Sequence, residues 1–345
     1  MSISLSRAAV WLPEGYEDAA EIAARSGIPE SVIIHKMGIT RKCRARADEQ
    51  PSMMAIEAAR DVLSDLDPQH IDLLIWTGSE YKDHPVWSAG IFVQEAMGLS
   101  RAWAFDLAAR CSSNVVGLHV ARAMMLADPN LNRVLICGGH RTGDLVNYTD
   151  EKARFLFNLS DGGSAMLLER NGPNPLAPAS ILTDGRFSLD VIIPAGGTRQ
   201  PAGPQVNPDD YFLTCPDIEG MRQRLGETTQ DNFLKVIRAA QKLAQFEAID
   251  YLALLQLKPS AFQQILHDLG LNPEQSRFMD HFGHFGAPDA LVSLALAQAE
   301  QRTVAGARCI LASAGIGYTW SAIGCTLSQP LFSKTSIERV LSCVA

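Results

Sequence analysis

Residues 105–118 have the sequence FDLAARCSSNVVGL and carry Cys111 between two segments of different pattern. The apolar run 102–109 before the cysteine is typical of a short buried strand. The segment 112–128 after it repeats apolar residues at the spacing of one helix face, as in Val115, Leu118, Ala121 and Met125. We therefore predict a strand, a turn that carries Cys111, and an apolar helix.

The same alternation continues on both sides of this stretch. Apolar runs predict strands at 71–79, 133–139 and 249–257, and a pair of strands within 307–327; helical patterns cover 88–99, 259–270 and 288–301, and 196–210 is rich in loop residues. Strands that alternate with helices indicate an α/β protein. The order of elements recurs along the chain, which predicts two similar halves, 1–170 and 171–345.

Composition restricts the setting of the protein. The 345 residues have a formal net charge of −8, with 47% hydrophobic and 20% charged residues. This balance argues against nucleic acid and anionic membranes as partners. No apolar stretch is long enough to span a bilayer, and the first residues lack the apolar core of a signal peptide. Seven widely spaced cysteines without a CxxC pair favour a reducing, cytoplasmic location and make a disulfide framework or a zinc knuckle unexpected.

Cys111 is the candidate nucleophile. A thiol at the start of a helix faces unpaired backbone N–H groups and the positive end of the helix dipole, and both stabilise a thiolate. The same N–H groups can bind an oxyanion as it develops. The alternative is a buried, unreactive cysteine that only fills space.

Several stretches together resemble the ketoacyl-ACP synthase III enzymes of the thiolase superfamily. They are the region around Cys111 and the segments 38–63, 159–169 (LSDGGSAMLLE), 194–201 (PAGGTRQP) and 315–322 (GIGYTWSA). The resemblance implies a thiolase-like five-layer αβαβα fold, a homodimer, and Cys111 as the residue that carries the acyl group. It also implies an oxyanion hole from the backbone N–H groups of Cys111 and Ile316, and a pocket that includes Gly315 and Gly317.

The chain departs from this family at two catalytic positions. Family members keep a histidine in an HQAN motif and an asparagine in an HGNTS-like motif. Here the segment 255–258 (LQLK) places Leu255 at the histidine and Lys258 at the motif's asparagine, and His284 occupies the position of the catalytic asparagine. Leucine cannot donate a hydrogen bond to a thioester oxygen, so half of the arrangement that stabilises an enolate is missing. Losing one such donor costs on the order of 10²–10³ in rate.

His284 and Asp289 predict a different chemistry. An imidazole accepts a proton, and a nearby carboxylate fixes its tautomer, so Cys111, His284 and Asp289 form a predicted Cys-His-Asp triad. This replacement resembles a subgroup of synthase-III-like acyltransferases that form esters on hydroxyl groups. Two alternatives stay open: a condensing or priming ketosynthase, since a priming subgroup carries a similar pair, and a non-catalytic partner subunit.

Some of these residues also have a purely structural explanation. Asp289 follows Pro288 at a predicted helix start, where the dipole favours an acid whatever its function. His281 and His284 form an H-x-x-H pair, but the glycines around them indicate a loop and no third ligand is near in sequence, so no metal is expected. We expect His281 to line the pocket or to be structural.

The acyl donor is expected to be a thioester of coenzyme A or of the phosphopantetheine arm of an acyl carrier protein. Four basic residues of the segment 35–48 are candidates to bind its phosphates: Lys36, Arg41, Lys42 and Arg44. The alternative is an ordinary solvated surface. Family members that bind free coenzyme A commonly stack its adenine on a tryptophan, where this chain has Val32, which favours a carrier protein. No resident cofactor is expected, and the acceptor is expected to be a small metabolite.

Overall fold

The computed structural model describes residues 2–344 and contains two main β-sheets. The first sheet has the strand order β1 (Ile3–Trp11), β7 (Asp161–Arg170), β6 (Arg133–Arg141), β4 (Leu73–Trp76), β5 (Trp103–Asp106). The second has the order β8 (Leu176–Thr183), β11 (Thr319–Leu327), β10 (Ala307–Gly315), β9 (Tyr251–Leu254). Each sheet combines parallel and antiparallel pairs. A small third sheet pairs β2 (Tyr16–Asp18) with β3 (Arg41–Cys43).

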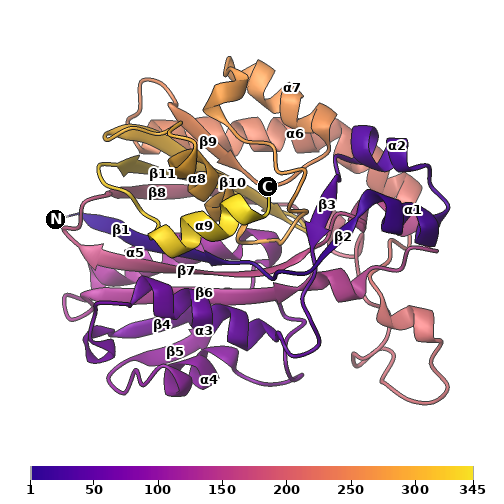
Figure 1. Cartoon of the computed structure of the whole chain (residues 1–345), viewed down its shortest axis with the longest axis horizontal. Coiled ribbons are helices and arrows are strands. Elements are labelled where there is room, and N and C mark those ends of the chain that lie inside the picture. The colour runs from indigo at the N-terminus through magenta and orange to yellow at the C-terminus, as the bar shows by residue number, and fades with distance from the viewer. Residues whose placement is uncertain (1, 345) are drawn as a thin grey trace.

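Helices separate and cover these sheets in five layers, as Figure 1 shows. Two helices lie between the sheets and pack on both: α5 (Ser113–Ala127) and α8 (Asp289–Ala299). The outer face of the first sheet is covered by α3 (Pro51–Val62) and α4 (Ala89–Ala96). The outer face of the second is covered by α6 (Ile218–Leu243) and α7 (Pro259–Leu269). This is the αβαβα arrangement that the sequence predicts.

The remaining helices lie at the margins of the layers. The last helix, α9 (Lys334–Ser342), packs against α8 and β1, so the C-terminal segment returns to the first sheet. Near the N-terminus, α1 (Ala19–Ser26) and α2 (Glu30–Val32) precede a short π-helical turn, η1 (Ile33–Met37). Short 3-10 turns include η3 (Arg110–Ser112), η4 (Thr142–Leu145) and η5 (Glu151–Leu156).

Local sequence explains where several elements begin and end. α7 begins with Pro259 at its first position, where the missing N–H costs no hydrogen bond, and ends at Gly270 with φ +69°. α8 is buried along nine consecutive residues from Asp289 to Ala297, because it is enclosed by both sheets. The chain brings two helix starts, one from each half of the sequence, into the central layer.

Candidate active site

Cys111 lies in the tight turn η3, between β5 and α5. The preceding residue, Arg110, has a positive φ of 53°. The turn is held by β10 of the other sheet: Ser313 Oγ donates to the Cys111 carbonyl at 2.6 Å. A Cβ on Gly315 would come within 2.6 Å of the Ala109 carbonyl oxygen and 3.0 Å of the Cys111 nitrogen. Only glycine permits this close approach, so the nucleophile turn and the end of β10 are fitted to each other.

The structure brings Cys111, His284 and Asp289 together in the predicted order. His284 Nε2 lies 3.2 Å from Cys111 Sγ, and its Nδ1 lies 2.6 Å from Asp289 Oδ2. The Asp289 side chain has no exposed surface, and that of His284 is 12% exposed. An imidazole held between a thiol and a carboxylate can move a proton at the sulfur while its second nitrogen stays anchored.

The buried carboxylate of Asp289 is fully satisfied. Its Oδ2 also accepts from the backbone N–H of Gln256 at 2.8 Å, and its Oδ1 accepts from that of Phe285 at 2.8 Å. These bonds, and the position at the start of α8, hold the carboxyl group in one orientation beside His284. Burial opposes a charge on His284, but the charges of Asp289 and Cys111 outweigh it and raise the pKa of His284 well above its ordinary value.

The loop that carries His284 is bound to a neighbouring strand start by its backbone. His284 N–H donates to the Asn158 carbonyl at 2.6 Å, and Ser160 N–H donates to the His284 carbonyl at 3.0 Å. Gly283, with φ +77°, lies against this segment, where a Cβ would meet the Asn158 carbonyl oxygen at 2.7 Å. The position of the imidazole is therefore set by residues 158–160 as well as by Asp289.

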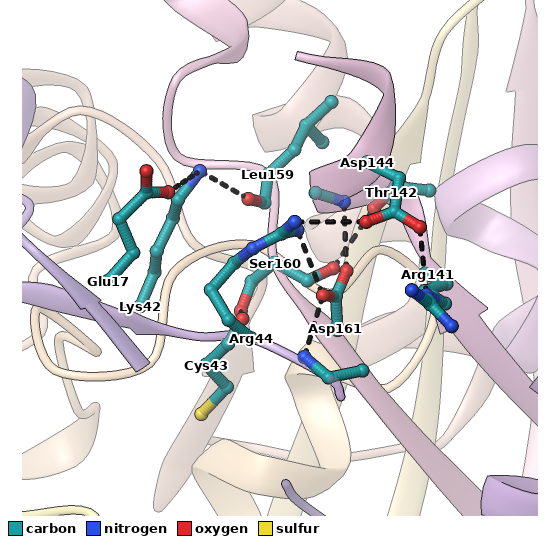
Figure 2. A network of polar contacts seen from close by, with 12 residues as sticks. Glu17, Lys42, Cys43, Arg44, Arg141, Thr142, Asp144, Leu159, Ser160 and Asp161 are labelled. Atoms are coloured by element: carbon teal, nitrogen blue, oxygen red, sulfur yellow. Dashed lines mark hydrogen bonds and ion pairs between the residues drawn. The ribbon is translucent and has the colours of Figure 1, made fainter. Parts of the chain in front are cut away.

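A buried polar network holds residues 158–160 in position (Figure 2). Lys42 Nζ donates to the carbonyls of Phe157 at 2.8 Å and Leu159 at 2.9 Å, and lies 3.4 Å from Glu17 Oε2. Next to it, Ser160 Oγ donates to the carbonyl of Phe282 at 2.6 Å and lies 3.0 Å from that of Cys43. The network thus connects β3 to residues 157–160, and through Ser160 to Phe282, which lies two residues before His284.

The network corrects the expectation for the basic segment. Lys42 is completely buried, and burial lowers its pKa to about 8, so it has a structural position and cannot reach a donor. Arg44 pairs with Asp161 and Asp144, each at 2.9 Å, and Arg41 donates to the Cys343 carbonyl. Of the four predicted donor-binding residues, Lys36 alone lines the cavity that contains Cys111.

This cavity has a volume of about 1310 Å³ and is lined by Cys111, His284, the predicted pocket residues Leu255 and Gly317, and the predicted oxyanion-hole residue Ile316. One further prediction is corrected among the described residues. Gly315 packs against the cysteine turn and does not line the cavity, because β10 runs directly beneath that turn. His281, expected to line the pocket or to be structural, lies outside the lining, with its Nδ1 3.1 Å from Asp280 Oδ1.

Two residues of the site had no assigned role in the sequence interpretation. Gln256 orients Asp289 through its backbone, and its side-chain oxygen accepts from Met279 N–H at 3.0 Å. The sequence signal that could have found Gln256 is its position directly after Leu255, which stands where the family has its catalytic histidine. His140, at the end of β6, is 4% exposed and lines the cavity. No local pattern in the sequence places this histidine beside Cys111.

Across residues 2–344, no group of three or more His, Cys, Asp or Glu side chains is arranged to hold a metal ion. All seven cysteines are free thiols. Within the same residues, none of the helices has the length and apolar character needed to cross a membrane.

Comparisons with known proteins agree with the family resemblance. Family models described as 3-oxoacyl-[acyl-carrier-protein] synthase III and its C-terminal region match residues 105–185 and 240–326. The chain is 27% identical over 320 residues to the β-ketoacyl-[acyl-carrier-protein] synthase III of Bradyrhizobium sp. strain BTAi1, covering 90% of this chain and 94% of that protein.

Solved structures share the fold. The 3-oxoacyl-(acyl carrier protein) synthase III from Pseudomonas aeruginosa PAO1 superposes with a TM-score of 0.83 at 18% identity, over 95% of this chain and 99% of that one. The priming β-ketosynthase of the R1128 polyketide pathway gives 0.83 at 19% identity, over 95% and 97%. The chain is therefore similar to 3-oxoacyl-[acyl-carrier-protein] synthase III enzymes in the two matched regions and along most of its length, and it shares their fold.

Proposed function

We propose that this protein is an acyltransferase that carries an acyl group on Cys111 and passes it to a hydroxyl, or less favourably an amine, of a small metabolite. The observation that carries the proposal is the position of His284, hydrogen-bonded to the nucleophile on one side and to buried Asp289 on the other. Leu255, which lines the same cavity, offers no second donor for an enolate.

The first half of the reaction loads the enzyme. The Cys111 thiolate attacks the carbonyl carbon of a thioester, and the backbone N–H groups of Cys111 and Ile316 are the proposed donors to the oxyanion. When the tetrahedral intermediate collapses, the C–S bond to the donor breaks. The donor thiolate leaves and takes the proton from His284.

The second half transfers the acyl group. Once Cys111 is acylated its negative charge is gone, so the pKa of His284 loses one of the influences that raise it. His284 Nε2 then accepts the proton of the acceptor hydroxyl while the oxygen attacks the thioester carbon. Asp289 holds the proton on Nδ1 and stabilises the imidazolium. Collapse releases the ester and restores the Cys111 thiolate.

The cavity mouth supports a phosphate-bearing donor. Besides Arg110, which pairs with Glu80, five exposed cationic residues line the cavity: Lys36, Lys152, Arg154, Arg222 and Lys258. Such a group suits the phosphates of coenzyme A or of a phosphopantetheine arm, and the surface of an acidic carrier protein. Val32 lies in the same lining, and its aliphatic side chain cannot stack with an adenine, which favours the carrier protein.

We also propose a homodimer. β5 is an edge strand of the first sheet, and three large apolar side chains near it are exposed: Ile91, Phe92 and Trp103. An uncovered edge strand with apolar neighbours is a surface that a second copy can cover.

The deciding experiment uses a malonyl thioester and an acyl thioester in parallel, with a panel of hydroxyl acceptors. We expect acyl-Cys111 by intact mass, an ester product, and no CO₂ from the malonyl donor. Cys111→Ala is the control and should take up no acyl group. A β-keto product with release of CO₂ would instead identify a condensing or priming enzyme, and no loading from any thioester would indicate a non-catalytic subunit.

A further inference from the structure

A second imidazole, that of His140, faces the nucleophile. His140 lies at the carboxyl end of β6, is 4% exposed, and lines the same cavity as Cys111 and His284. The mechanism above makes no use of it. A buried polar ring beside a nucleophile needs a reason, because hiding its nitrogens from water costs free energy unless a partner binds them.

Gly286 defines the space between the two groups. A Cβ on Gly286 would lie 3.3 Å from His140 Nδ1 and 3.5 Å from Cys111 Sγ. Its φ of +92° suits glycine alone. His140 Nδ1 and Cys111 Sγ therefore border one small space that any side chain at position 286 would fill.

The two histidines are in opposite states of charge. Burial, together with the charge of His284, lowers the pKa of His140 to about 3, so His140 is neutral. His284 is held by a carboxylate, and its pKa is raised. A neutral imidazole cannot serve as a proton source at neutral pH, but it donates one hydrogen bond and so can orient a polar group.

We propose that His140 is the second hydrogen-bonding residue of the acceptor subsite, and that the acceptor is an alcohol whose attacking oxygen lies between the two imidazoles. His140 donates from Nδ1 to this oxygen, and His284 accepts the hydroxyl proton at Nε2. The assignment rests on the acyltransferase function proposed above. The His140 imidazole gives this cavity a polar group that can contact the substrate, whereas the Leu255 side chain in the same lining is apolar.

The step is balanced without a further reactant. The C–S bond of acyl-Cys111 breaks, the C–O bond of the ester forms, and the hydroxyl proton moves to His284. His140 gains and loses no proton. Its contribution is orientation, which affects transfer to a hydroxyl and not the loading of Cys111, since loading occurs before the acceptor is needed.

The test separates the two half-reactions in His140→Leu and His140→Gln. Cys111 is loaded with an acyl-N-acetylcysteamine thioester, and deacylation is followed in single turnovers with 1-butanol and 1,3-butanediol, and separately with hydroxylamine. We expect normal loading, normal cleavage by hydroxylamine, and alcohol transfer reduced about 10- to 100-fold in His140→Leu, the scale of one lost orienting contact. His140→Gln, which keeps a donor, should recover part of this loss.

His267 provides the matched control, since its side chain is 82% exposed on α7. His267→Leu should leave both half-reactions unchanged. Equal alcohol transfer in the wild type and His140→Leu would overturn the assignment, as would equal losses in loading and transfer. A wild-type enzyme that loads acyl groups but forms no ester with any alcohol would overturn the acyltransferase function itself, and this proposal with it.

Discussion

The central helices α5 and α8 both begin at the catalytic centre, but the catalytic residue at one helix start is accessible and the one at the other is buried. Cys111, just before α5, is partly accessible, and its Sγ contacts His284. Asp289, the first residue of α8, has no exposed surface and accepts three hydrogen bonds. One helix start offers a reactive atom to substrate, and the other encloses the carboxyl group that holds the imidazole.

This difference shows that one helix start presents the group that reacts with substrate, while the other holds the group that stabilises the imidazole. A nucleophile has to meet substrate, whereas the charge that stabilises an imidazolium acts best where water cannot screen it. His284 connects the two and is itself held by backbone bonds to residues 158–160. Four predictions, made on three substitutions, test this division.

His284→Asn removes the proton acceptor and leaves both helix starts in place. Transfer of the acyl group to an alcohol should fall on the order of 10⁴-fold, the upper range for loss of a general base. The measurement is a single-turnover assay with loading of Cys111 followed by intact mass. Adding Leu255→His in the same chain restores the family's pair of donors, and this double variant should release CO₂ from a malonyl thioester. Alcohol transfer at the wild-type rate in His284→Asn would contradict the role of the imidazole.

Asp289→Asn keeps the size of the side chain and removes its charge. Transfer should fall on the order of 10³-fold, because the imidazole loses both its fixed tautomer and the stabilisation of its cation.

The same substitution has a signature in stability. Asp289 helps to raise the pKa of His284 above its value of about 6.5 in the unfolded chain. The stabilisation is thus fully present below that value and is lost as pH rises through the folded pKa. The free energy of unfolding of the wild type, measured in urea at a series of pH values, should fall over this window more steeply than that of Asp289→Asn. Parallel pH curves for the two proteins would contradict this.

Lys42→Met tests the support beneath the His284 loop. The substitution leaves Glu17 without its buried ammonium partner and two carbonyls without a donor. The free energy of unfolding should fall by about 3–5 kcal/mol, the range for breaking a buried ion pair. The control is Lys36→Met at the exposed cavity mouth, which should change stability by less than about 0.5 kcal/mol and raise the KM for a carrier-protein donor. Equal stabilities for the two variants would show that the network does not support the fold.

The site was predicted from sequence where residues lie at fixed places relative to their own elements. Cys111 precedes a helix with an unmistakable apolar pattern, and Asp289 opens another, so both positions followed from local periodicity together with the family resemblance. The basic segment shows the reverse. Lys36, Lys42 and Arg44 are alike in sequence, yet one lines the cavity and the other two are enclosed by β7 and its neighbouring turns.

The sequence by itself determined the α/β alternation, the helix starts and the three residue types of the triad, because these depend on side-chain period and chemistry within short segments. The tertiary structure alone decided which groups meet. It places Ser313 and Gly315 against the cysteine turn, Gln256 on Asp289, and His140 beside Cys111. These contacts join residues far apart in the chain, and their geometry is set by how two sheets pack on shared helices, which no local pattern specifies.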